Sequence, residues 1–155
     1  MGQEIERKFL VISDKWSQVV KPSGDEYRQG YLVSTPEKTI RVRITRKNAF
    51  LTIKGQTKGI SRSEFEYEIP VSEATDLLAQ FAISELRKVR FKVKHDNHLW
   101  EVDEFSGKHE GLILAEIELK DENEEFSIPD WVGQEVSGDE RFYNSYLAEV
   151  QPKEN

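Results

Sequence analysis

The feature that most constrains this chain is an alternation of charged and apolar side chains that recurs in about eight segments. Successive side chains of a β-strand point to opposite faces, so each segment is expected to form a strand with one charged face and one apolar face. Short turn-forming stretches separate the segments, which is typical of antiparallel neighbours. The predicted strands are 4–11, 26–33, 39–45, 50–54, 61–69, 86–94, 100–103 and 113–120.

Acids and bases share the charged faces of these predicted strands. The acids are Glu4, Glu6, Glu64, Glu66, Glu68, Glu101, Asp103, Glu116 and Glu118, and the bases are Lys8, Arg41, Arg43, Lys54, Arg62, Lys88, Arg90, Lys92 and Lys94. One arrangement is an open sheet whose charged side faces water and whose apolar side lies under the helices. The other is a closed eight-stranded barrel whose charged faces line a wet interior, wide enough for one small ligand. The alternation by itself leaves both open.

In a closed barrel, the mixture of charges has a chemical use. Glu4 and Glu6 would lie about 6.5–7 Å apart on one strand face, where their charges repel unless a cation lies between them. Carboxylate oxygens are the hard ligands that Mg²⁺ and Mn²⁺ prefer. Arg41, Arg43 and other bases would bind a multiply charged anion. Phosphoryl transfer requires fixed cations, a metal ion and a positioned water, so the pattern favours that chemistry.

Composition narrows the function classes. The 155 residues carry a net charge of −7, which disfavours nucleic acid as a partner because nucleic-acid-binding surfaces are basic. The absence of cysteine excludes disulfides and thiolate metal sites, and it fits a reducing cytoplasm. No apolar run is long enough to suggest a membrane span. We therefore expect a cytoplasmic protein with one domain over 1–155, in which 151–155 form a frayed tail, and a possible homodimer.

Three helices are expected around the strands. The first covers 13–20 and is capped by Ser13, the second covers 73–83 and is capped by Ser72, and the third covers 139–150. The segment 128–133 is predicted to be irregular and to pack on the domain through its apolar residues. The three histidines fall in predicted turns and loops without ligand spacing, so they are expected to be solvated rather than catalytic.

The motifs, taken in order, resemble the CYTH domains, also called triphosphate tunnel metalloenzymes. The first strand matches the Glu-x-Glu-x-Lys signature of that family, and the length resembles its short, single-domain bacterial members. Each piece is weak alone, but together they cover almost the whole chain. The matching pieces are 4–11, 28–32, 41–43, 52–54, 61–68, 88–90, 101–103, 116–118 and 139–142.

This resemblance implies an α+β, mainly β, fold: an eight-stranded antiparallel closed tunnel with a charged interior, with helices packed outside and Mg²⁺ or Mn²⁺ bound. It implies Lys88 and Glu6 as catalytic residues, with Lys88 positioning water or protonating the leaving phosphate. The implied metal ligands are Glu4, Glu6, Glu64, Glu66, Asp103, Glu116 and Glu118. The implied phosphate-binding residues are Lys8, Arg41, Arg43, Lys54, Arg62, Arg90 and Arg141.

The implied activity is hydrolysis of inorganic triphosphate to pyrophosphate and phosphate. The alternatives are a hydrolase or cyclase acting on thiamine triphosphate or ATP, a non-catalytic phosphate- or nucleotide-binding module, and a structural sheet domain. The last motif departs from the family pattern: the short members have Arg-Tyr-Lys-Asn, whereas this chain has Arg141-Phe142-Tyr143-Asn144 and so lacks the lysine. This departure affects one phosphate contact and the substrate preference.

Overall fold

The computed structural model describes residues 2–149, and these form mainly β-structure. The strands are β1 (Gln3–Val11), β2 (Asp25–Ser34), β3 (Lys38–Ile44), β4 (Ala49–Gly55), β5 (Ser61–Ile69), β6 (Ser84–His95), β7 (His98–Phe105), β8 (Ile113–Glu118) and β9 (Val132–Glu135). The helices are α1 (Ser13–Trp16), α2 (Val71–Phe81) and α3 (Asn144–Glu149), with 3-10 turns η1 (Gly107–His109) and η2 (Glu140–Phe142). No helix within 2–149 is both long and apolar enough to cross a membrane.

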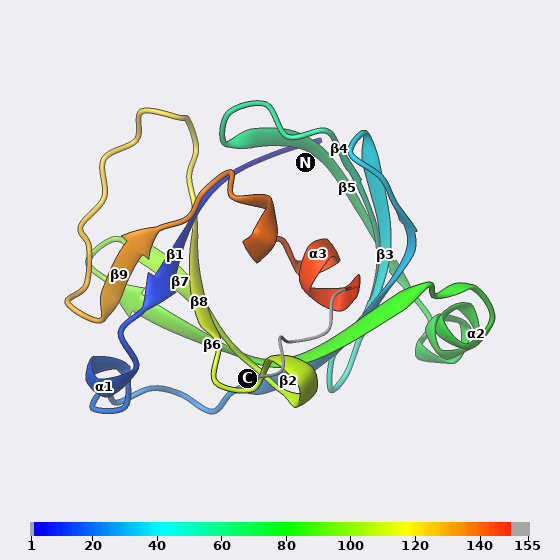
Figure 1. The fold of residues 1–155 in the computed structure, drawn as a ribbon, viewed down its shortest axis with the longest axis horizontal. Helices are drawn as coiled ribbons and strands as arrows, with labels where there is room; N and C mark the ends of the chain where they lie inside the picture. Colours follow the sequence, from blue (N-terminus) through cyan, green and yellow to red (C-terminus); the bar gives the residue numbers. More distant parts are fainter. Residues whose placement is uncertain (1, 150–155) are drawn as a thin grey trace.

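The first eight strands close into an antiparallel barrel, which Figure 1 shows in a view that looks through the ring of strands. Hydrogen-bonded neighbours follow the order β5-β4-β3-β2-β6-β7-β8-β1, and β9 extends the sheet beyond β1. Short pairing between β1 and β5 closes the ring, with Glu4 opposite Arg62. The closed-barrel prediction is therefore confirmed, and the open sheet is excluded.

The pairing register brings acids and bases from distant parts of the sequence onto one inner surface. Lys8 of β1 pairs with Glu116 of β8, and Arg90 of β6 pairs with Asp103 of β7. Thr52 of β4 pairs with Arg41 of β3 on one side, and β5 lies on its other side. Because the side-chain period of a strand is two residues, a register shifted by one residue would turn these charges outward.

The outward faces of the strands are apolar, and other elements cover much of them, although part of the outer face of β4 and β5 stays exposed. One cluster, under α1 and the segment before β9, contains Phe9, Trp16, Trp100 and Trp131, with the rings of Trp16 and Trp131 5.0 Å apart. The other lies under α2 and contains Val42, Ala49, Ala74 and Leu78. Gly30 permits this approach, because a Cβ there would lie 2.5 Å from the Leu78 side chain.

Helix α3 lies inside the ring of strands in Figure 1, whereas α1 and α2 lie outside it. Leu147 and Ala148 of α3 pack against Tyr31, Leu86 and other residues that continue the lumen-facing alternation of their strands, including Phe105 and Leu114. The interior is therefore charged along most of its length and apolar at the end that α3 covers. The prediction that the helices pack outside is correct for α1 and α2 and wrong for α3.

Several boundaries differ from the predictions. Helix α2 begins at Val71 rather than 73, after Pro70, and α1 follows Ile12; neither Ser72 nor Ser13 acts as a side-chain cap. The predicted third helix is a 3-10 turn followed by a short α-helix, and its last predicted residue, 150, lies outside the described residues, as does the predicted tail 151–155. The segment 128–133 packs on the barrel as expected, but it leads into the unpredicted strand β9.

Candidate active site

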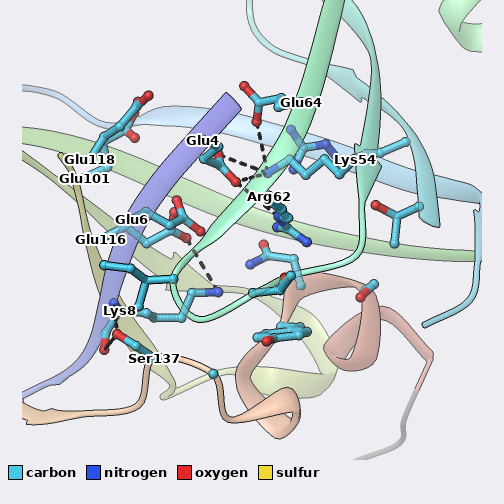
Figure 2. A pocket seen from close by; sticks show the side chains of 18 of the residues that line it. Glu4, Glu6, Lys8, Lys54, Arg62, Glu64, Glu101, Glu116, Glu118 and Ser137 are labelled. Atoms are coloured by element: carbon cyan, nitrogen blue, oxygen red, sulfur yellow. Dashed lines mark hydrogen bonds and ion pairs between the residues drawn. The ribbon is translucent and has the colours of Figure 1, made fainter. Parts of the chain in front are cut away.

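The barrel encloses a polar cavity of about 230 Å³. Figure 2 shows the side chains that converge on it from β1, β4, β5 and β8, with the segment before α3 at one end. The lining includes most of the predicted site residues, and these are Glu4, Glu6, Lys8, Arg41, Arg43, Lys54, Arg62, Glu64, Glu66, Lys88, Arg90, Glu116 and Glu118.

Arg41 and Arg43 form a group of cations with few partners. Their terminal nitrogens lie 3.9 and 3.6 Å from Glu66 Oε2, which is beyond hydrogen-bonding distance. The Nε atoms of both arginines are buried and have no hydrogen-bond partner among residues 2–149. Burial and the nearby charges of Arg41 and Arg90 lower the pKa of Arg43. This crowding of cations marks a place for an anion, because an anion in the cavity would relieve the repulsion and accept hydrogen bonds from the terminal nitrogens.

Glu4 lies at the centre of a second group. Lys54 Nζ donates to both carboxylate oxygens of Glu4 at 3.1 and 3.2 Å, and Arg62 Nε donates to one of them at 3.2 Å. Lys54 also lies 3.2 Å from Glu64. Burial raises the pKa of Glu4, but Lys54 and Arg62 outweigh that effect and lower it to about 2. Glu4 is therefore ionised at neutral pH.

Glu6 and Glu116 lie close enough for their charges to interact strongly. Burial and the charges of Glu116 and Glu4 raise the pKa of Glu6 well above its usual range. Burial also opposes ionisation of Glu116, but Lys8 and Arg90 hold its pKa well below the usual range. Lys8 Nζ lies 3.8 Å from Glu116. The cations of the wall are thus too few or too distant to neutralise every carboxylate in this part of the cavity.

Lys88 and Arg90 extend from β6 to a buried carboxylate, Asp103. Arg90 donates to both oxygens of Asp103 at 2.7 and 2.8 Å, and Lys88 Nζ donates to one of them at 2.8 Å. Burial lowers the pKa of Lys88 to about 7, although the charge of Asp103 opposes this. Lys88 is therefore easier to deprotonate than an ordinary lysine, a property that suits a general acid or base.

Two predicted site residues lie away from the cavity lining. Arg141 is mostly exposed and pairs with Asp139 at 2.7 Å on the surface, so the structure does not bring it to the phosphate-binding group. Asp103 is fully buried behind Lys88 and Arg90, and both of its oxygens accept hydrogen bonds from them. This geometry fits a residue that holds the two cations in place better than a direct metal ligand.

Some polar residues of the cavity region were not identified from the sequence. Thr52 donates to Glu66 at 2.9 Å, and Gln29 is fully buried beside Asn144, the first residue of α3. Applying the two-residue period to neutral polar residues would have found Gln29 and Thr52. Asn144 begins a helix and lacks this period, although it stands at the last position of the family motif Arg-Tyr-Lys-Asn.

The histidines take structural positions. None of them lines the cavity within the described chain. His98 bonds to Glu124 at 2.6 Å, His95 to Ser127 at 3.1 Å, and His109 to the carbonyl of Leu147 at 2.6 Å. These contacts hold loops and the end of α3 in place. The histidines were expected to be solvated, but His98 and His109 are hydrogen-bonded and only partly exposed. That they are not catalytic stays a prediction.

The carboxylates suit a divalent cation in chemistry, although two of them, Glu4 and Glu116, are arranged here as ion pairs with the bases. No group of three or more acidic or histidine side chains within 2–149 is arranged to hold a metal. The donor set of Glu4, Glu6, Glu116 and Glu118 nevertheless consists of hard oxygen ligands, as Mg²⁺ and Mn²⁺ require. Burial, together with the charges of Glu116 and Glu4, raises the pKa of Glu6 and so disfavours its ionised form. A bound cation would stabilise that ionised form, so the residues fit the metal.

Comparison with known proteins gives consistent results. The family model of the CYTH domain matches residues 2–143. An inorganic triphosphatase of Acetivibrio thermocellus is 49% identical over 148 residues, which are 95% of this chain and 94% of the relative. An inorganic triphosphatase of Nitrosomonas europaea is 36% identical over 154 residues, with 94% and 96% of the two chains covered. The crystal structure of the inorganic triphosphatase NE1496 matches with a TM-score of 0.67 and 32% identity, covering 97% of both chains.

The ion pairs of Glu4 predict a specific pH dependence of stability. Because the pKa of Glu4 is lowered in the folded state, its charge stabilises the fold above the unfolded pKa near 4.5, and this contribution is lost as the pH falls toward 2. At pH 7 and without ligands, Glu4→Gln is expected to lower the free energy of unfolding by on the order of 3 kcal/mol. Urea unfolding at pH 7 and at pH 3 measures this.

The difference between wild type and Glu4→Gln should shrink at pH 3. The exposed Glu37, which makes no hydrogen bond or ion pair within the described chain, supplies the matched control Glu37→Gln, which should leave stability nearly unchanged at both pH values. A Glu4→Gln variant as stable as wild type at pH 7 would show that repulsion from Glu6 and Glu116, rather than attraction to Lys54 and Arg62, dominates at this position.

Proposed function

The chain belongs to the CYTH domain family, and from this premise we propose that it hydrolyses inorganic triphosphate to pyrophosphate and phosphate inside its tunnel, with a divalent metal ion bound. The two relatives named inorganic triphosphatase align with nearly the whole chain, so the aligned region spans the strands that line the tunnel.

The observation that carries the proposal is the weak pairing of two arginines in the cavity wall. Arg41 and Arg43 line a cavity that also contains Lys54, Arg62 and Arg90, and their terminal nitrogens lie 3.9 and 3.6 Å from Glu66, too far for a hydrogen bond. Leaving a charged donor buried and unsatisfied costs free energy, and an anion with many oxygens recovers that cost. A triphosphate chain supplies such oxygens along its whole length.

The metal is proposed to bind among Glu4, Glu6, Glu116 and Glu118, and the ion to be Mg²⁺ or Mn²⁺. When bound, it would neutralise phosphate charge and polarise the phosphoryl oxygens. In the ligand-free tunnel, Glu4 is paired with Lys54, and Glu66 lies near Arg41. A triphosphate that binds Lys54 and Arg41 would leave Glu4 and Glu66 without their positive partners. This supports the proposal that the metal ion and the triphosphate bind together.

Lys88 is proposed to assist the reaction itself. Lys88 is one of the residues that line the cavity, and its lowered pKa would allow it either to orient a water molecule or to protonate the leaving phosphate. Asp103 holds it from behind. Phosphoryl transfer requires little covalent chemistry from the protein, so positioning and charge stabilisation by such groups account for most of the catalysis.

The size of the cavity favours an inorganic substrate over an organic one. Its volume of about 230 Å³ lies below the range of roughly 300–1,000 Å³ of pockets for drug-sized ligands. Tyr31 lines the apolar end under α3, and Trp131 is buried in the outer core, so neither is placed as an open platform for a base or a thiazolium ring. A nucleoside triphosphate would have to leave its organic part outside the cavity.

Assembly, compartment and domain extent also remain predictions. A second copy is proposed to bind at the outer face of β4 and β5, where Ile53, Phe65 and Tyr67 are exposed and where β5 beyond Glu64 pairs only with β4. Such a strand edge is self-complementary in an antiparallel twofold pair. Sedimentation velocity should show a dimer that Phe65→Lys dissociates, and a wild-type monomer would refute it.

Fractionation of the source cells tests the cytoplasmic location, and limited proteolysis tests the single domain over 1–155.

Phosphate release from a panel of triphosphates tests the function. The wild-type chain should hydrolyse inorganic triphosphate faster than ATP or thiamine triphosphate, give pyrophosphate and phosphate in equal amounts, and lose activity when a chelator removes the divalent ion. Faster turnover of ATP or thiamine triphosphate would change the substrate assignment. Tight binding without turnover would identify a binding module, and full activity with the chelator would refute the metal requirement.

Arg41→Ala tests the anion-binding group. It should lower kcat/KM for inorganic triphosphate by about 10- to 100-fold, because one charge-assisted hydrogen bond to phosphate contributes about 1.5–3 kcal/mol. Arg41→Lys keeps the charge but not the planar donor pair, and should recover only part of the loss. The matched control is Arg46→Ala, on the exposed turn after β3. An Arg41→Ala variant with wild-type kcat/KM would exclude this residue from substrate binding.

A further inference from the structure

Lys88 has a second hydrogen-bond partner besides Asp103. Its Nζ lies 2.7 Å from Oδ1 of Asn144, which is slightly closer than the 2.8 Å to Asp103 Oδ2. The Lys88 side chain is 2% exposed, so nearly all of its contacts are with protein or with what occupies the cavity. Two fixed acceptors on different elements, β7 and α3, hold the nitrogen from two directions. A single acceptor would let it rotate about one hydrogen bond.

The orientation of the Asn144 amide is determined by its neighbours. Both groups that face its Oδ1 are nitrogen donors, Lys88 Nζ at 2.7 Å and Gln29 Nε2 at 3.3 Å. An amide NH₂ in that position would place donors against donors. The oxygen therefore points at Lys88. Asn144 itself lines the cavity, and its NH₂ has no acceptor among the described residues in the hydrogen-bond network.

Gln29 supports this orientation at a cost to its own hydrogen bonding. It is fully buried, and its Nε2 donates to Asn144 and to the Tyr31 hydroxyl at 3.1 Å. Its Oε1 is left without any partner within residues 2–149. A buried unsatisfied oxygen costs about 1–3 kcal/mol, so such groups are rare in native structures and call for an explanation. Here the explanation is that Gln29 donates to Asn144 and so keeps the Asn144 oxygen on Lys88.

Helix α3 is docked firmly enough to place Asn144. Leu147 and Ala148 are buried in the apolar end of the tunnel. At the other end of the helix, His109 Nε2 donates to the carbonyl of Leu147 at 2.6 Å, and Lys108 donates to the carbonyl of Ala148. The packing and these carbonyl contacts fix the helix independently of Lys88.

We propose that Asn144 is a positioning residue for triphosphate hydrolysis. Its Oδ1 holds the Lys88 nitrogen so that the hydrogen-bonding position of that nitrogen not used by Asp103 or Asn144 faces the substrate. The inference rests on the proposed function and on the catalytic use of Lys88. It also gives α3 a role in the reaction: the helix that closes the apolar end of the tunnel supplies the second support of the catalytic nitrogen.

Two variants at Asn144 separate the acceptor from the side-chain volume. Asn144→Leu keeps the approximate size but removes the oxygen, and it should lower kcat for inorganic triphosphate by about 10- to 100-fold, because a catalytic group displaced by about 1 Å costs that order of rate. Its KM should change much less, since Arg41, Arg43 and Lys54 carry the binding. Asn144→Asp keeps an oxygen acceptor and should retain kcat to within about fivefold.

The control on the same helix is Tyr146→Ala, which removes an exposed ring from α3 and should leave kcat and KM near wild type. A double-mutant cycle with Lys88→Met covers the case in which Asn144→Leu folds poorly. In the Lys88→Met background, the same substitution at Asn144 should cause little further loss of kcat, because the group that it positions is already absent.

The outcomes distinguish this inference from the proposed function. A wild-type chain that hydrolyses inorganic triphosphate, together with an Asn144→Leu variant of wild-type kcat, would overturn the role of Asn144 alone. Equal losses in Asn144→Leu and Asn144→Asp, or fully additive losses in the cycle, would also overturn it. A wild-type chain without triphosphatase activity would overturn the proposed function and this inference with it.

Discussion

The structure depends on one electrostatic constraint: acids and bases enclosed in a tunnel must compensate one another, because water does so only partly. Removing a charge from water is costly unless an opposite charge and hydrogen bonds replace the solvent. The wall meets this requirement unevenly. Asp103 is fully compensated by Arg90 and Lys88, whereas Arg41 has an unpartnered Nε–H and Glu6 lies among other carboxylates. The uncompensated positions are where ligands of opposite charge are expected.

The same constraint explains the inverted arrangement of the barrel. With the charges inside, the apolar face of every strand points outward and needs its own cover. Helix α2 covers one side, and α1 with the segment before β9 covers another, where three tryptophans pack together. These outer elements favour the register that keeps the charges inside. A shift of one residue would turn the charged side chains outward, beneath the covering elements, and the apolar side chains into the lumen.

The strands and most of the site were predictable because both follow a two-residue period. Alternation placed Glu4, Arg41 and Arg90 on one surface, although nothing in the pattern distinguished a closed barrel from an open sheet. Strand β9 is short and follows an acidic loop, so it has no alternation to read. Arg141 matches a family motif but is held by Asp139 on the surface, and Asn144 reaches Lys88 only because α3 folds into the tunnel. Motif and period do not report such tertiary contacts.

The closed end of the tunnel links substrate choice to catalysis. Because α3 fills the apolar end with Leu147 and Ala148, a ligand has access only to the charged part of the lumen, and that part is small. The residue that begins this helix, Asn144, is also the one that contacts Lys88. A longer or organic ligand that displaced α3 would therefore remove one hydrogen-bond acceptor of the Lys88 nitrogen as it entered. A chain of phosphates that fits beside α3 leaves that contact intact, so under the proposed role of Lys88 one short helix favours the inorganic substrate both by volume and by geometry.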